Sequence, residues 1–157
     1  MISVDRYVRR NIKRFKTPVP IKGFAPILGK EPKVCQTAHE AVQCIKSHDR
    51  VFIHEVVHSP HDLIKALSER RFELEGVETT GIFPTGIECL EEDTPEHRKA
   101  FTGNCQFIGA PSRKSLLRKP PHDCFLPMFL HEVPQHNRSP NFPIDVALMT
   151  LSPPNEH

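Results

Sequence analysis

Two short stretches of the sequence hold residue types that could carry out chemistry. The first is His54-Glu55-Val56-Val57-His58, which spells the His-Glu-x-x-His motif of zinc proteases. That chemistry needs a helix, because both imidazoles must project from one face toward the metal while the glutamate acts as base. The motif here follows an apolar run and ends at Ser59-Pro60, and proline disfavours the α conformation in the residue before it. We therefore expect residues 51–57 to form a strand and its exit loop, with no metal bound. A zinc hydrolase that uses His54, Glu55 and His58 is the least favoured alternative.

The second stretch is Ser152-Pro153-Pro154-Asn155, which directly follows the apolar run of residues 144–151. Open α/β sheets bind their ligands beyond the carboxyl ends of the strands, so a binding site is expected here. A rigid turn without a ligand is the alternative interpretation. Arg113 and Lys114, near the start of a predicted short helix, are candidates to meet phosphate groups. Solvated surface cations are the alternative for these two residues.

The stretch from residue 37 to residue 80 has the elements that would position such groups, since it reads as helix, strand, helix, strand. Thr37 and Glu40 have the spacing of a capping box, and Ser59 followed by Pro60 predicts the start of the second helix. This pattern predicts an α/β domain built on a largely parallel sheet flanked by helices. The expected helices are 38–47 and 60–70, with shorter ones from Thr94 and over 112–118, and the expected strands are 51–54, 77–83, 105–108 and 144–151.

Three details complete this expected architecture. The run of residues 144–151 is apolar throughout, which is typical of a strand buried on both faces. The proline within residues 125–130 predicts an edge strand or a loop. The acidic cluster of residues 88–93 is expected to lie in a solvated loop.

The charge is distributed unevenly along the chain. Residues 1–33 hold nine Lys/Arg against two acidic residues, a balance of +7, and the remainder holds twelve against seventeen, a balance of −5. Residues 1–33 therefore predict a basic N-terminal arm or a mitochondrial targeting segment, with a cytoplasmic location as the alternative. Residues 34–157 predict one domain. Nucleic-acid binding is not expected, because the basic residues do not continue into the folded body.

Cysteine usage and hydropathy bound the environment of the protein. The five cysteines are an odd number and form no C-x-x-C pair, which indicates reduced thiols inside a cell. No apolar run approaches the roughly 20 residues that a membrane-spanning helix needs, so no membrane partner is expected.

Four segments together resemble the acetyl-CoA hydrolase/transferase family, which includes acetate and 4-hydroxybutyrate CoA-transferases. These segments are IKSHDRV, SPHDLIKAL, FIGAPSRKSLLRKPPHDCFLPMFLHEVP and IDVALMTLSPPNEH. The chain departs from the family pattern at several positions, which include the absence of a glycine in the third of these segments. His48 stands where the family usually has glycine, Glu55 where a small residue is usual, and Cys124 and Asn155 where it has aspartate.

The resemblance implies a CoA-transferase-like N-terminal domain that ends within the Ser-Pro-Pro motif. The full enzyme would transfer CoA between acetate and another carboxylate through a glutamyl-CoA thioester, or hydrolyse acetyl-CoA. Coenzyme A would be a substrate, bound at Gly109, Arg113, Ser152, Pro153, Pro154 and Asn155.

The same resemblance places the catalytic glutamate and its glycine-rich loops after the Ser-Pro-Pro motif. No catalytic residue is therefore assigned in this chain, and none of its glutamates lies in a matching context. The expected partners are acyl-CoA and carboxylate substrates, a C-terminal catalytic domain, and a second copy in a homodimer. The alternative from another class is a non-catalytic remnant or interaction module that keeps the fold.

Overall fold

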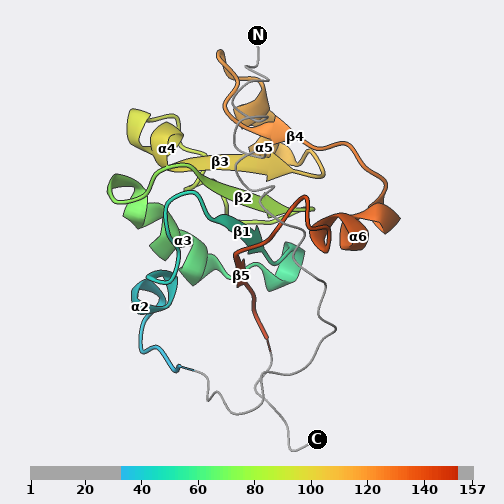
Figure 1. The fold of residues 1–157 in the computed structure, drawn as a ribbon. Coiled ribbons are helices and arrows are strands. Elements are labelled where there is room, and N and C mark those ends of the chain that lie inside the picture. Colours follow the sequence, from blue (N-terminus) through green and yellow to red (C-terminus); the bar gives the residue numbers. More distant parts are fainter. Residues whose placement is uncertain (1–32, 152–157) are drawn as a thin grey trace, which may run out of the picture.

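The computed structural model describes residues 33–151. These residues form a five-stranded sheet with the order β4-β3-β2-β1-β5, in which every neighbouring pair of strands is parallel (Figure 1). The strands are β1 (Arg50–Ile53), β2 (Val77–Gly81), β3 (Phe101–Cys105), β4 (Cys124–Phe125) and β5 (Val146–Leu148). The predicted α/β class with a parallel sheet is confirmed. The N-terminal arm and Ser152–Asn155 lie outside the described residues.

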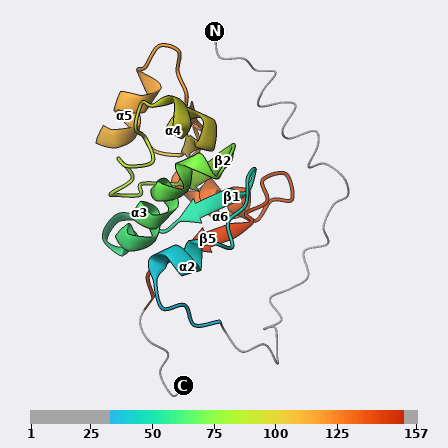
Figure 2. The ribbon, with the colours of Figure 1, turned by 90° about the vertical axis from the view of Figure 1, so that its left-hand side faces the viewer.

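Five α-helices are assigned within the described residues. They are α2 (Ala38–Val42), α3 (His61–Glu69), α4 (Pro95–Ala100), α5 (Ala110–Leu116) and α6 (Val133–Asn137), and short 3₁₀ turns lie at Val56–His58, Arg70–Phe72 and Leu130–Glu132. Figure 2 shows α3, α4 and α5 grouped on one side of the strands. No helix among residues 33–151 combines the length and the hydropathy needed to cross a bilayer.

The hydrophobic core lies between one face of the sheet and helices α2, α3 and α4. The sheet contributes Val51, Ile53, Val77, Phe101 and Leu148, each buried and alternating with residues of the other face. Helix α3 contributes its buried stripe, of which Ile64 and Leu67 are fully inaccessible. The periodicity of the sequence marked both sets, because a strand and a helix each bury one side at their own repeat.

The opposite face of the sheet is polar. Arg50 and Glu78, at the starts of β1 and β2, form an ion pair of 2.6 Å with side chains that are 1% and 9% exposed. Asn104 of β3 donates its amide to the same Glu78 carboxylate (3.3 Å). The Arg50 guanidinium also lies 3.8 Å from the centre of the Phe142 ring, which joins the loop after α6 to this face. This network is held by hydrogen bonds and charge, in contrast to the apolar packing of the other face.

The helix starts were predicted with mixed success. The Thr37 hydroxyl accepts the Glu40 N–H (3.1 Å), as a capping box requires, but the Glu40 carboxylate accepts the N–H of Gln36 (3.0 Å) instead of that of Thr37. Ser59 does not cap α3. Pro60 occupies the cap position, and the Ser59 hydroxyl accepts the N–H of Thr85 (2.9 Å) from the neighbouring loop.

Several predicted bounds were wrong. The first helix ends at Val42, well before residue 47, whereas α3 nearly matches its prediction. The third strand covers 101–105 rather than 105–108, since the segment FTGNC pairs along its whole length with β2 despite weak strand residues. The fifth strand is only three residues long and lies at the sheet edge with Ala147 exposed, so it is not buried on both faces. The short β4 confirms the expected edge position near residue 125.

Candidate active-site wall at the carboxyl edge of the sheet

The His-Glu-x-x-His residues do not form a zinc-protease helix. Strand β1 ends at Ile53, and only residues 56–58 form a 3₁₀ turn. The imidazoles of His54 and His58 stack with centroids 5.1 Å apart and planes inclined by 24°, so the rings face each other instead of converging on one point. Within residues 33–151, no group of three or more His, Cys, Asp or Glu side chains is arranged to hold a metal ion.

Glu55, which would be the catalytic base in a zinc protease, instead makes a structural hydrogen bond. Its carboxylate accepts the N–H of Ile82 at 2.6 Å, which links the loop after β1 to the loop after β2. Burial raises the pKa of this carboxyl, and the hydrogen bond from Ile82 opposes the effect. The contact was not predicted, because residue 82 is distant in sequence and only the parallel pairing of β1 with β2 brings the two loops together.

Gly109 lies where β3 has ended and α5 begins, as its cap residue. A Cβ atom built on Gly109 would lie 2.7 Å from the ring of Phe83, so that ring packs directly on the glycine backbone. Phe83 in turn contacts Phe107 edge to face, with ring centroids 5.5 Å apart. Arg113 is exposed one helical turn later, and its N–H donates to the Gly109 carbonyl (3.0 Å). Contact of Gly109 and Arg113 with coenzyme A stays a prediction.

An open groove of about 630 Å³ lies where the strand order reverses. The chain runs from β1 to β2, β3 and β4 on one side and returns to place β5 on the other side of β1. In open α/β sheets this switch point, outside the carboxyl ends of the strands, is the usual ligand position. The groove is lined by the start of α2, the start of α3 and residues 149–151, which lead directly to Ser152.

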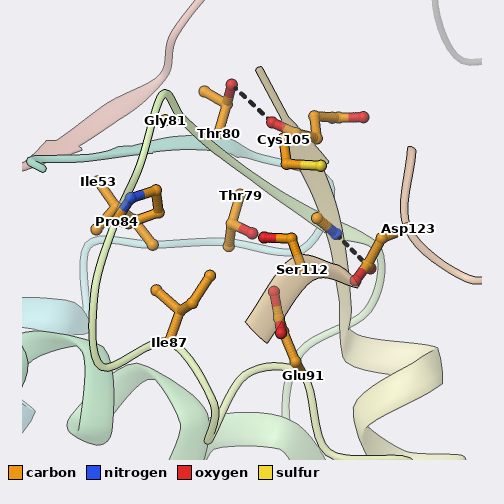
Figure 3. A pocket seen from close by; sticks show the side chains of 12 residues that line it. Ile53, Thr79, Thr80, Gly81, Pro84, Ile87, Glu91, Cys105, Ser112 and Asp123 are labelled. Atoms are coloured by element: carbon orange, nitrogen blue, oxygen red, sulfur yellow. Dashed lines mark hydrogen bonds between the residues drawn. The ribbon is translucent and has the colours of Figure 1, made fainter. Parts of the chain in front are cut away.

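A smaller, more enclosed pocket of about 20 Å³ lies beneath the carboxyl ends of β2 and β3, with room for about one water molecule. Figure 3 shows Glu91, Ser112 and Asp123 converging on it from three different segments. The Asp123 carboxylate accepts the N–H of Gly103 (2.8 Å) and the hydroxyl of Ser115. The sequence showed no sign of this cluster, because Glu91, Ser112 and Asp123 belong to three separate segments that only the tertiary fold brings together.

Burial changes the acidity of two groups in this pocket. It raises the pKa of Glu91 to about 7, with a further contribution from the Asp123 carboxylate. It also raises the pKa of the Cys105 thiol to about 11, which keeps that thiol protonated and weakly nucleophilic. The expected solvated loop is therefore wrong for Glu91, whereas Glu88 in the same loop is exposed.

Large apolar side chains are exposed on the loops that follow the strands. They are Val56 and Val57 after β1, Phe107 after β3, Phe129 and Leu130 after β4, and Met149 and Leu151 after β5, with exposed fractions from 43% to 85%. The described part of the chain has four other exposed large apolar residues, which are scattered. Apolar side chains gathered at one edge mark a surface that binds a partner or a ligand.

The sequence and the fold of this chain were compared with those of known proteins. The sequence profile of the acetyl-CoA hydrolase/transferase N-terminal domain matches residues 31–157. The butyryl-CoA:acetate CoA-transferase of Anaerostipes caccae is 33% identical over 126 residues, and the 4-hydroxybutyrate coenzyme A transferase of Clostridium kluyveri is 30% identical over 122 residues. These matches cover 80% and 77% of this chain but 27% of each relative, so the chain spans about a quarter of their length.

The solved structure of RipA from Yersinia pestis has the same fold. It superposes with a TM-score of 0.63 at 19% sequence identity, covering 72% of this chain and 28% of that chain. The profile match over most of the chain and the transferase relatives agree with the motifs from IKSHDRV to the Ser-Pro-Pro end. The chain therefore belongs to the acetyl-CoA hydrolase/transferase family, whose N-terminal domain it matches.

Proposed function

We propose that this chain provides one wall of the acyl-CoA site of a CoA-transferase. The observation that carries the proposal is the family match over residues 31–157. The groove at the switch point and the apolar loops of the same edge support it, because a wall of this kind is left open until a second part covers it. In the full enzyme, CoA would pass between acetate and another carboxylate, or acetyl-CoA would be hydrolysed.

The reaction implied by the family resemblance is covalent. A glutamate carboxylate attacks the thioester carbonyl and expels CoA thiolate, which leaves a mixed anhydride. The thiolate then attacks the glutamyl carbonyl, releases the first carboxylate and forms a glutamyl-CoA thioester. A second carboxylate then attacks the glutamyl-CoA thioester, and the same steps in reverse release this carboxylate as its CoA thioester. Backbone N–H groups stabilise each oxyanion.

Two glutamates at this edge, Glu55 and Glu91, are unsuited to the role of nucleophile. The Glu55 carboxylate already accepts the Ile82 N–H. Glu91 faces a pocket of about 20 Å³, too small for a thioester, and its raised pKa keeps much of it protonated near neutrality. We therefore propose that a C-terminal catalytic domain supplies the nucleophile and covers the apolar edge. A homodimer would extend the same assembly, and the basic balance of residues 1–33 supports a mitochondrial location.

A non-catalytic remnant that keeps the fold is the second candidate. It is favoured by His48, which has φ of 71° where the family usually has glycine. Glycine adopts this left-handed region without strain and other residues do not, so the chain departs from the family pattern at a position where the backbone favours glycine.

A domain exchange tests the proposal. Residues 31–157 would replace the matching N-terminal segment of the A. caccae butyryl-CoA:acetate CoA-transferase, and transfer of CoA from butyryl-CoA to acetate would be measured. An active chimera that forms a glutamyl-CoA adduct, detected by mass spectrometry, supports the proposed transferase function. A folded but inactive chimera supports the remnant.

The isolated chain is expected to be silent toward acetyl-CoA. Neither free thiol above background nor a mass increase should appear, because the chain supplies a wall without the nucleophile. Either signal, abolished by one Glu→Gln change within residues 1–157, would overturn the proposal.

A further inference from the structure

The loops after β1 and β2 are joined by a set of hydrogen bonds that the proposed reaction leaves unexplained. The Glu55 carboxylate accepts the Ile82 N–H (2.6 Å), and the Val56 N–H donates to the Phe83 carbonyl (3.1 Å). The Thr85 hydroxyl donates to the Val56 carbonyl (2.9 Å). Glu55 is the one ionisable side chain in this set of three bonds, and it makes the shortest of them.

The same loop contains a strained residue. Val56 has φ of 52°, and a β-branched side chain in the left-handed region is an outlier. Such conformations persist only where surrounding contacts hold them, and they cluster at functional sites. Val56 is 49% exposed, so side-chain burial does not account for the conformation. The hydrogen bonds of its backbone N–H and carbonyl to the second loop do account for it.

The joined loops determine where Phe83 lies. Phe83 follows Ile82, and its own carbonyl accepts the bond from Val56. Its ring packs on Gly109 at the start of α5, close enough that a Cβ atom there would be 2.7 Å away. A series of contacts therefore connects Glu55 to Gly109 through one backbone hydrogen bond and the Phe83 ring.

We propose that Glu55 is a positioning residue of the proposed acyl-CoA wall, which holds the loop after β2 so that Phe83 lies over Gly109. The identity of the ligand, an acyl-CoA, rests on the proposed function, whereas the contact between Glu55 and Ile82 rests on the structure alone.

Amide hydrogen exchange measured by NMR on the full chain tests the contact. Glu55→Ala should lower the protection factor of the Ile82 amide by about tenfold or more, as expected on loss of a hydrogen bond to a charged acceptor. Protection of Thr79, inside β2, should be unchanged, and the Phe83 ring should lose its NOEs to Gly109. Glu55→Gln, which retains an oxygen acceptor, should restore most of both signals.

Glu132→Ala is the matched control, since its carboxylate also accepts one loop N–H, that of Phe129 (2.8 Å). It should leave Ile82 unaffected. Equal loss of protection at Ile82 and Thr79 in Glu55→Ala would show a purely global effect and overturn the proposal, as would unchanged Ile82 protection.

Titration with coenzyme A separates this inference from the proposed function. Chemical shifts of Gly109 and Arg113 that respond in the wild type, and respond differently in Glu55→Ala, support both. Identical responses in the two proteins refute the positioning role while keeping the proposed function. If no shift responds in either protein, the proposed function fails at this wall and Glu55 has no ligand to position.

Discussion

Replacing Glu91 with glutamine should remove a pH-dependent loss of stability. Burial raises the pKa of this carboxyl from 4.5 to about 7, the Asp123 carboxylate adds to the effect, and Arg118 opposes it. Because the folded-state pKa lies above the unfolded one, the proton favours the folded state. This contribution is complete below about pH 4.5 and is lost as the pH rises through about 7.

The size of the effect follows from the same two pKa values. The interval from 4.5 to about 7 corresponds to at most about 3.4 kcal/mol, at about 1.36 kcal/mol per pKa unit. Glu91 retains some solvent contact, and solvent screening reduces the figure to about 2 kcal/mol. Glutamine has the shape of the protonated acid and carries no charge, so Glu91→Gln should match the wild type near pH 4 and exceed its stability by about 2 kcal/mol near pH 8.

Urea unfolding at a series of pH values measures this difference directly. Glu88→Gln is the control, because Glu88 lies in the same loop and is exposed. Its stability should follow the wild-type pH dependence closely. If the curve of Glu91→Gln ran parallel to that of the wild type from pH 5 to pH 8, burial of this carboxyl in the folded state would be refuted.

Three further predictions concern the backbone at His48, the buried ion pair of Arg50 and the N-terminal arm. His48→Gly should raise the unfolding free energy by about 0.5–1 kcal/mol in urea titrations, because glycine relieves the strain at φ 71°, and a loss would show that the side chain contributes more than the strain costs. Arg50→Met should lower it by about 3–5 kcal/mol, since the Glu78 charge is then buried without its partner. Adding Glu78→Gln should recover part of that loss, and no recovery would argue against the ion pair as the cause. Deleting residues 1–33 should leave the melting temperature nearly unchanged if they are an appended arm, whereas a large drop would show that they pack on the domain.

Local signals in the sequence predicted the class of the fold and much of its first half. Alternating start signals and apolar repeats between residues 37 and 80 led to β1, α3 and β2, because secondary structure with one buried side leaves a periodic trace. The unusual backbone at His48 also had a sequence signal, namely a side chain where the family usually has glycine. The family itself was recognisable from short motifs, and the profile match confirmed it.

The sequence determined the parallel α/β class, the family and the order of the main elements, since these depend on patterns within a few residues. Tertiary structure alone decided that β3 begins at Phe101 and that β5 is a short edge strand. It also decided that the Glu55 carboxylate accepts a hydrogen bond from the N–H of Ile82. It also brought Glu91 against Asp123 and changed its pKa. These features depend on which strands pair in the sheet and on how far packing shields a side chain from water. The spacing of residues along the chain specifies neither of them.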